Sequence, residues 1–392
     1  MSVPFWFADT NNSVVRYVDA SGIITTPALT SADSVYNNNG GFSTPWGCAL
    51  DRNNGLFVVD NGSVAAPPNS CCVYRIDTAT LVVTRVAGGG GGGAQAWVFS
   101  QIYEVAVDAA GNVYIADAGT AGTGHPNSAL QIVCLNRQAT TQNILGVSIP
   151  AGAMAVVAGN QTLGFSGDGG PAISAELSLP YGMVLDATGN LYFCDADPNH
   201  TCVVRKVNTS GIITTICGQP GSPGFSGDGG PASAAKLNQN SGITIDAAGN
   251  LYVVDTQNFC VRAINNQSST QTLFGVSIGV GAIKTIAGQG GTPGYSGDGG
   301  GATAALLGYT GGSSPFGPWG AIPDGTGNLL IADTFNFRIR MVTSAGIIST
   351  IVGTGTNGYS GDGGPATSAK ISQVYNIALG SIVRPPSCQI IT

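Results

Sequence analysis

The chain has 392 residues, only 9% of them charged, with 60 glycines and a formal net charge of −7 at pH 7. We therefore expect no nucleic-acid partner, because phosphate contacts need clustered Lys and Arg and the sequence has no basic cluster. We also expect no membrane span, because no apolar run is long enough to cross a bilayer. Abundant Gly, Ser, Thr, Asn and Val favour many short strands joined by tight turns.

In chain order, the first predicted strands are 5–9, 14–18 and 23–26. The clearest unit follows at 180–218, where strands at 181–186, 191–195, 202–207 and 212–216 are separated by Gly-Asn and Ser-Gly turns. Short strands with such turns are typical of hairpins, and a four-stranded meander repeated radially is a propeller blade. The second strand ends in aspartate in six copies: Asp9, Asp60, Asp117, Asp195, Asp255 and Asp333.

The first copy lacks its first strand, and a matching segment stands at the other end of the chain, at 374–379. A C-terminal strand that completes the N-terminal blade would close the ring and remove two free sheet edges. We therefore predict an all-β fold, a single six-bladed β-propeller with four antiparallel strands per blade. The approximate blades are 374–384 plus 1–28, 45–88, 102–159, 180–218, 240–288 and 318–353.

A second repeated element, Gly-Phe/Tyr-Ser-Gly-Asp-Gly-Gly, occurs at 164–170, 224–230, 294–300 and 358–364. Its aspartates, Asp168, Asp228, Asp298 and Asp362, suggest a calcium site, but one carboxylate per loop falls far short of six to eight oxygen ligands. Glycines at positive φ and an aspartate bonded to nearby amides favour a structural loop instead. The Pro-Ala that follows suits one helical turn.

These linkers, together with Asp195 to Arg205, Asp255 to Arg262 and Asp333 to Arg340, resemble the NHL-repeat family over nearly the whole chain. The linkers at 27–45 and 87–101 depart from the pattern, and blades three and five carry insertions at 138–153 and 267–282. The resemblance implies a propeller fold and a range of roles, from protein- and RNA-binding modules to extracellular sensors and a few lyases, so it does not fix function.

One further repeated feature has a structural interpretation. A carboxylate–guanidinium pair across the strand two–three hairpin, as in Asp195 with Arg205 or Asp9 with Arg16, recurs in most blades and so indicates a structural role.

The chain has two histidines, His125 and His200, which fall in neighbouring blades and suggest a metal site with Asp197. His200 occupies the signature position of the repeat, however, and a third histidine is absent.

The candidate site comes from aligning the six first strands on their terminal aspartate. The position five residues earlier is aromatic in five blades, which predicts a ring of aromatic side chains at one mouth of the central channel. The alternative is that these rings pack between blades. The next position is glycine in four blades, with Glu104 and Asn376 in the other two. The predicted ligand-binding residues are Trp46, Tyr103, Glu104, Tyr181, Trp319, Tyr375 and Asn376.

We expect a non-enzymatic binding or interaction module for a glycan or peptide segment at this mouth. One alternative is a metal-assisted lactonase or lyase with an axial ion, calcium being possible, at Glu104 and Asn376. Another is a structural subunit of an extracellular assembly that self-associates through the two insertions. The longer loops at 61–70 and 118–128 would stand beside the mouth and contribute to recognition.

Nine cysteines and a low Lys and Glu content favour an extracellular or periplasmic location, and the chain shows no leader sequence. Cys194 and Cys202 bracket one hairpin connection and are a candidate disulfide.

Overall fold

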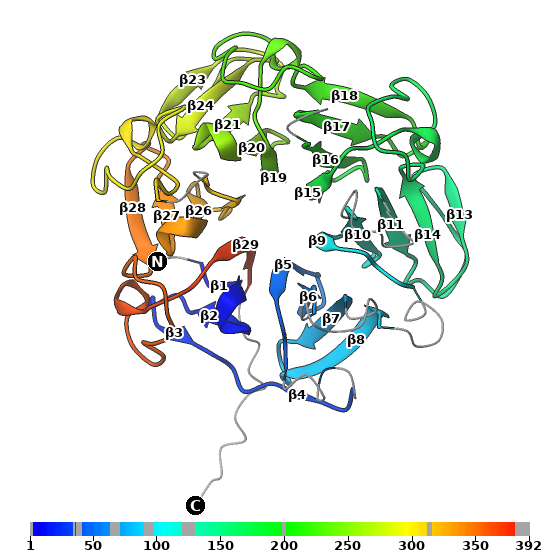
Figure 1. Ribbon diagram of the computed structural model, residues 1–392, viewed down its shortest axis with the longest axis horizontal. Coiled ribbons are helices and arrows are strands. Elements are labelled where there is room, and N and C mark those ends of the chain that lie inside the picture. Colours follow the sequence, from blue (N-terminus) through cyan, green and yellow to red (C-terminus); the bar gives the residue numbers. More distant parts are fainter. Residues whose placement is uncertain are drawn as a thin grey trace, which may run out of the picture.

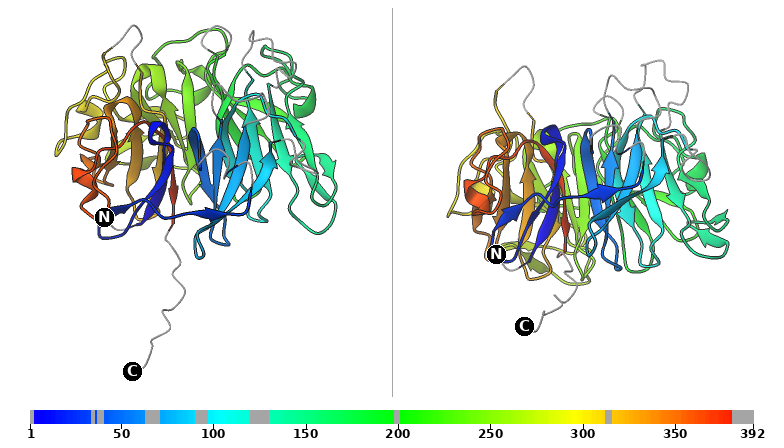
Figure 2. Two further views of the ribbon diagram at one scale, coloured as in Figure 1. Left: turned by 60° about the horizontal axis from the view of Figure 1, so that its bottom comes forward. Right: turned by 90° about the horizontal axis from the view of Figure 1, so that it is seen from below.

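Six antiparallel sheets surround a central axis in the computed structural model of the chain (Figure 1). The structure describes residues 3–33, 36, 41–62, 71–89, 97–119, 130–197, 201–311 and 316–380. Within them no helix is long and apolar enough to cross a membrane. The predicted six-bladed all-β propeller is confirmed, and the side views show its blades packed as a ring with strands roughly along the axis (Figure 2).

Each blade contributes one strand to the wall of the channel and three more toward the rim. The innermost strands are β29 (Val374–Leu379), β5 (Pro45–Leu50), β9 (Ile102–Val107), β15 (Pro180–Leu185), β19 (Asn240–Ile245) and β25 (Gly320–Pro323). The second strands are β1 (Phe5–Asp9), β6 (Gly55–Asp60), β10 (Val113–Asp117), β16 (Leu191–Asp195), β20 (Leu251–Asp255) and β26 (Leu329–Asp333).

The third strands are β2 (Val14–Val18), β7 (Cys72–Asp77), β11 (Gln131–Leu135), β17 (Val203–Val207), β21 (Cys260–Ile264) and β27 (Arg338–Val342). The outer strands are β3 (Ile24–Thr25), β8 (Val82–Gly88), β14 (Met154–Ala158), β18 (Ile213–Cys217), β24 (Ile283–Ala287) and β28 (Ile348–Val352). The short 3₁₀ helices are η1 (Thr10–Asn12), η3 (Ala172–Ser174), η4 (Ala232–Ala234), η5 (Thr256–Asn258), η6 (Ala302–Ala304), η7 (Thr334–Asn336) and η8 (Ala366–Ser368).

The ring closes through the two ends of the chain, as predicted. β29 pairs antiparallel with β1, with Phe5 opposite Leu379 and Phe7 opposite Ile377. The N–H of Ser372 also donates to the Asp9 carboxylate at 2.7 Å. Since β29 then lies inside β1 in the first sheet, residues more than 360 positions apart complete one blade and leave no open seam.

The hydrophobic core is divided among the six interfaces between neighbouring blades. Between blades three and four, Ile132 and Val157 of one blade meet Leu191 and Phe193 of the next. Leu177 from the intervening linker is fully buried in the same cluster. Each blade therefore buries both faces only when it has a neighbour on both sides.

The Gly-Phe/Tyr-Ser-Gly-Asp-Gly-Gly linkers hold a buried arginine of the blade that follows. The Arg262 guanidinium is fully buried and lies 2.6 Å from Asp228 of the linker and 3.4 Å from Asp255 of strand two. It also donates to the carbonyl oxygen of Ser226, and the Phe225 ring lies 5.2 Å from the guanidinium carbon. Aromatic ring, serine carbonyl and aspartate of the motif thus all bind one arginine.

The same arrangement recurs in three other blades. The linker pairs are Asp168–Arg205 at 2.8 Å, Asp298–Arg340 at 2.6 Å and Asp362–Arg16 at 2.6 Å. The predicted structural role of these loops is confirmed, and their carboxylates are occupied by arginine. The predicted pairs with the strand-two aspartate are present but longer, at 3.4–3.8 Å.

Blades two and three have lost this arginine. Tyr74 stands at its position in blade two and packs edge-on against Tyr36 and Phe42 of the degenerate linker. In blade three the position is Val133, so the buried Asp117 has no arginine beside it, and burial raises the pKa of its carboxyl to about 7. The two linkers that depart from the motif are therefore the two that precede blades without the arginine.

The two insertions form hairpins that clamp onto the next blade rather than project outward. They comprise β12 (Gln142–Ile144) with β13 (Val147–Ile149), and β22 (Gln271–Leu273) with β23 (Val276–Ile278). Leu145 and Ile149 are buried together with Val207 and Ile213 of blade four. Phe274 and Ile278 are buried in the same way with Val342 and Ile348 of blade six. Most of their apolar residues are thus used within the chain, and self-association through them stays a prediction.

One further strand, β4 (Thr30–Ser31), leaves blade one and pairs parallel with the outer strand β8 of blade two. The sheet of blade two accordingly has five strands, which the sequence did not indicate. This strand joins blades one and two directly by backbone hydrogen bonds.

The expected Cys194–Cys202 disulfide is absent, and both are free, buried thiols. Cys194 lies opposite Val204 in the register of β16 and β17, so Cys202 is displaced by two residues along the ladder. Diagonal positions of this kind are about 7–8 Å apart, farther than a disulfide spans. The other described cysteines are also free and buried, whereas Cys388 lies outside the described residues.

Replacing Arg262 with methionine should destabilise the protein by about 3–5 kcal/mol, because Asp255 would remain buried without its cation. Asp228→Asn should cost less, about 1–2 kcal/mol, since Asp228 is partly exposed to water. Urea unfolding would measure both, with Lys284→Met as a charge-matched control. An Arg262→Met variant no less stable than the control would contradict the structural role of the motif.

Candidate functional site

The five aromatic residues predicted at the mouth of the channel do gather there. Trp46 stacks on Tyr375 with ring centroids 4.2 Å apart and planes 11° from parallel. Trp319 meets Trp46 edge-on at 6.0 Å and Tyr375 edge-on at 5.1 Å. Rings from blades one, two and six are therefore in mutual contact, as expected for side chains that converge on one axis.

Blades three and four complete this cluster. Tyr103 lies 4.5 Å from Tyr181, edge-on, and 5.1 Å from Trp46. Tyr181 also meets Trp319 at 6.0 Å across the axis. We call these five residues, Trp46, Tyr103, Tyr181, Trp319 and Tyr375, the aromatic mouth.

The aromatic mouth is a packed layer rather than an open ring. Tyr181 and Tyr375 are buried, whereas Trp46, Tyr103 and Trp319 are partly exposed. The alternative that the rings pack is thus partly right, although they pack on one another over the axis. Edge-to-face and offset contacts of this kind are favourable by about 0.5–1.5 kcal/mol per pair.

Blade five contributes Ser241 instead of a ring. Its hydroxyl donates to the carbonyl oxygen of Trp319 at 2.9 Å and also hydrogen-bonds the Thr256 hydroxyl. Ser241 is itself buried, at 2% exposure. The one non-aromatic position therefore anchors the backbone that carries Trp319.

One residue further along each first strand, glycines allow neighbouring strands to approach closely. A Cβ atom on Gly182 would lie 2.6 Å from the carbonyl oxygen of Ser241, and one on Gly320 would lie 2.5 Å from that of Tyr375. A Cβ on Gly47 would lie 2.7 Å from a carboxylate oxygen of Glu104. The glycines predicted at this level are required by backbone contact between blades.

Glu104 and Asn376, the two exceptions, meet directly although 272 residues separate them. The Asn376 amide nitrogen donates to Glu104 Oε2 at 2.5 Å, and the N–H of Val105 donates to Oε1 at 3.0 Å. Glu104 is only 9% exposed, and burial raises the pKa of its carboxyl to about 8. Because no arginine or lysine lines this part of the described channel, hydrogen bonds alone oppose the cost of burial.

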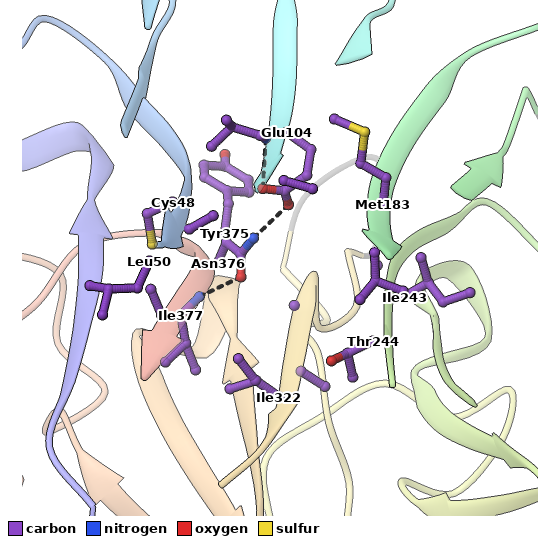
Figure 3. A pocket seen from close by; sticks show the side chains of 18 of the residues that line it. Cys48, Leu50, Glu104, Met183, Ile243, Thr244, Ile322, Tyr375, Asn376 and Ile377 are labelled. Atoms are coloured by element: carbon purple, nitrogen blue, oxygen red, sulfur yellow. Dashed lines mark hydrogen bonds between the residues drawn. The ribbon is translucent and has the colours of Figure 1, made fainter. Parts of the chain in front are cut away.

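Below the aromatic mouth the inner strands enclose a cavity of about 260 Å³ (Figure 3). Glu104 and Asn376 are at its polar end, next to Trp319 and Tyr375. Aliphatic side chains from all six blades form the rest of its wall, among them Leu50, Val107, Met183, Ile243, Ile322 and Ile377. The predicted site is thus two neighbouring sites, an aromatic layer and an apolar cavity with one buried carboxyl.

The sequence alignment missed the cavity because its wall consists of ordinary strand residues. The alternation of large and small apolar residues along the first strands is the same in a packed core as in a channel. Only the break in the glycine pattern at Glu104 and Asn376 indicated a polar feature on the axis. Closure of the ring also implies a central channel, but the sequence does not give the channel width and so does not predict a cavity.

The metal sites considered as alternatives find no support in the described residues. They contain no group of three or more His, Cys, Asp or Glu side chains that could hold a metal ion. Glu104 and Asn376 would offer an axial ion two side chains, while the other blades place Gly47, Gly182, Gly242 and Gly320 at that level. His125 and His200 lie outside the described residues, as do positions 63–70 and 120–128 of the predicted recognition loops.

Comparisons with known proteins agree with the repeat. Residues 136–223 match the family model of the Teneurin NHL domain. Human Teneurin-4 is 33% identical over 118 residues, 27% of this chain, and mouse Teneurin-3 is 33% identical over 121 residues, 30% of this chain. These alignments span 4% of each relative's length.

Solved structures resemble the chain only at the level of the fold. A Bacteroides thetaiotaomicron protein of unknown function is 16% identical, with a TM-score of 0.48 over 88% of this chain and 68% of that one. Virginiamycin B lyase from Staphylococcus aureus is 13% identical, with a TM-score of 0.42 over 78% of this chain and 69% of that one. At these values neither likeness carries an argument about function.

Replacing Glu104 with glutamine should change how stability depends on pH. The folded-state pKa of about 8 lies above the ordinary 4.5, so the wild-type group favours folding below pH 4.5 and loses this contribution as pH rises through 8. Glu104→Gln should therefore gain stability relative to wild type between pH 5 and 8.5, by roughly 3–5 kcal/mol. Urea unfolding at several pH values measures this, and a constant difference would show that Glu104 is not desolvated.

Proposed function

Since the chain carries NHL repeats in a six-bladed propeller related in sequence to the teneurin NHL domain, we propose that it is a non-enzymatic interaction module that binds a protein segment at its aromatic mouth. The observation that carries the proposal is the convergence of five aromatic side chains from five blades on one face of the channel. Tryptophan and tyrosine are the residues that most often dominate binding energy in protein interfaces.

The packing of the aromatic mouth suits recognition. Trp46, Tyr103 and Trp319 are partly exposed, while Tyr181 and Tyr375 are buried behind them. The Tyr103 and Tyr181 rings meet edge-on at 4.5 Å, and the Tyr375 hydroxyl donates to the Gln373 side chain at 2.9 Å. Because the rings already hold one another in place, these side chains would lose little conformational entropy when a ligand covers them.

A glycan is the second candidate ligand, because exposed tryptophan and tyrosine faces also stack against the apolar face of a sugar ring. Trp46, Tyr103 and Trp319 are the rings that remain partly exposed for such a contact. A protein segment is favoured over a glycan because polar groups that would fix sugar hydroxyls are sparse among the described residues of the mouth.

The enzymatic alternative is less well supported. A metal-assisted lactonase or lyase would need more oxygen ligands on the axis than Glu104 and Asn376 supply, and one carboxylate oxygen of Glu104 already accepts from Asn376. Elemental analysis of the purified protein tests this alternative, and stoichiometric calcium or zinc would support it.

An extracellular or periplasmic location is part of the proposal and rests on the low Lys and Glu content. The cysteines do not support it, because all eight in the described residues are free.

The test is binding to peptide and glycan arrays by a Trp46→Ala/Trp319→Ala double variant. Loss of two anchors should weaken binding at least 100-fold, at about 2 kcal/mol or more for each. A Trp46→Phe/Trp319→Phe variant keeps two aromatic faces and should retain most of the affinity. Tyr309→Ala, which removes an exposed ring outside the mouth, is the matched control. Unchanged binding by a folded double alanine variant would refute the site.

A further inference from the structure

The axial cavity differs from the aromatic mouth in chemistry and in the direction from which it is reached. Its polar end, at Glu104 and Asn376, lies against Trp319 and Tyr375, which belong to the packed aromatic layer. Its far end is lined by Leu50, Val107 and Leu185, which are partly exposed to solvent. The same three blades also line a depression formed by the turns beyond, so the cavity continues toward the opposite mouth of the propeller.

The cavity wall offers a ligand apolar contacts along its length and a carboxyl group at the end. Leu50, Ile243, Ile322 and Ile377 surround it (Figure 3). Among the described lining residues Glu104 is the one ionisable acid or base other than Cys48 and Tyr375. Burial raises the pKa of the Cys48 thiol and raises that of Tyr375 to about 12, so both are neutral near pH 7.

The Glu104 carboxyl retains unused hydrogen-bonding capacity. A carboxylate has about four acceptor positions, and two donors, the Asn376 amide and the Val105 N–H, occupy one on each oxygen. The Asn376 side-chain oxygen accepts from the N–H of Ile377 at 2.6 Å. The group that best complements such an end is a donor without an acceptor, which an ammonium is.

The opposite mouth carries negative charge. The turns between first and second strands each contain an aspartate: Asp51, Asp108, Asp186, Asp246 and Asp324. These carboxylates accept backbone N–H bonds within their own turns, as Asp186 does from Thr188 and Asn190. Burial tends to raise the pKa of Asp186, but hydrogen bonds from Asn190 and Thr188 lower it overall. Arg75 and Arg137 lie 3.4 and 3.8 Å from Asp51, and Arg52 lines the depression beside it, so this side of the mouth is neutralised. The negative charge is therefore concentrated on the side of Asp186, Asp246 and Asp324.

We infer that the axial cavity is a binding site for a primary alkylammonium group, which enters from the opposite mouth with its apolar chain along the channel and its ammonium at Glu104 and Asn376. The ligand class comprises free aliphatic amines and diamines and the side chain of lysine. The acidic turns raise the local concentration of a cation at the entrance. This site adjoins the aromatic mouth, with which it shares Trp319 and Tyr375, but it does not depend on the function proposed for the mouth.

Binding should release a proton. The empty site holds Glu104 largely protonated at pH 7, and a bound ammonium stabilises the carboxylate form, so the proton passes to the buffer. Affinity should therefore rise about tenfold per pH unit from pH 6 to 8 and level off above pH 8 while the amine stays protonated.

Isothermal titration calorimetry of the full chain with pentylamine, in buffers of different ionisation enthalpy, tests the inference. Wild type should bind with release of close to one proton per site at pH 7, whereas pentanol, of similar shape and without charge, should bind at least 50-fold more weakly. Glu104→Gln keeps a hydrogen-bonding partner for Asn376 and should lose both the affinity and the proton release. Glu176→Gln, at the only other glutamate of the chain, is the matched control and should behave as wild type.

Two further arms identify the source of the amine. Binding of Nα-acetyl-lysine methylamide would assign the site to a lysine side chain of a partner, and binding of pentylamine or 1,5-diaminopentane alone would assign it to a free amine. Equal affinity of wild type and Glu104→Gln for pentylamine, or no binding at millimolar concentrations, would overturn the inference. Pentylamine binding by Trp46→Ala should match wild type, because Trp46 belongs to the aromatic mouth but does not line the cavity.

Discussion

Closure of the ring is the constraint on which the rest of the structure depends. Every blade presents two apolar faces, and the six hydrophobic clusters lie between blades rather than within them. A chain of six blades without closure would expose one such face at each end. The pairing of β29 with β1 removes both, and it also brings Asn376 within hydrogen-bonding distance of Glu104. Fold and candidate sites thus share one origin.

Within the closed ring, neighbouring blades are joined in different ways. Four of them receive a linker whose aspartate, serine carbonyl and aromatic ring surround a buried arginine. This arrangement places a guanidinium between two carboxylates, and the desolvation cost of the cation is met by charged and backbone acceptors together. In blade two, Tyr74 packs with Tyr36 and Phe42 instead, and Asp33 of the linker pairs with Arg85 of the outer strand at 3.1 Å. Ionic and aromatic solutions therefore coexist at equivalent positions of one repeat.

The sequence predicted the repeat, the number of blades and the closing strand, because these follow from turn residues and strand periodicity that are local in the chain. It also placed seven axial residues at two levels of the channel, since register fixes which residues of each first strand lie at the same height. It did not predict that Trp46 and Tyr375 would stack, or that Glu104 would reach Asn376 over Gly47. Those contacts depend on the channel diameter and on side-chain rotamers.

The failed disulfide prediction has a related cause. Cys194 and Cys202 are close in sequence and face the same cluster, but the register of β16 and β17 displaces them by two residues. A loop length read from the sequence does not give this register. The sequence also provided no placement for the insertions that form β12–β13 and β22–β23, whose apolar residues Leu145 and Phe274 bury against the following blade.

The unequal joints give the ring a preferred breaking point. Hairpins pack blade three against blade four and blade five against blade six. Buried arginines bind the linkers that lead into blades one, four, five and six. Strand β4 pairs blade one with blade two. Between blades two and three the described residues show apolar contacts, the Asn61 amide on the backbone of Ile102 and one long, partly exposed ion pair between Arg137 and Asp51 at 3.8 Å. The buried Asp117 accepts backbone hydrogen bonds there but has no arginine partner among the described residues. A pulling force, or a partner that separates two blades, would open the ring first between blades two and three. The closed propeller would then become an open row of six blades.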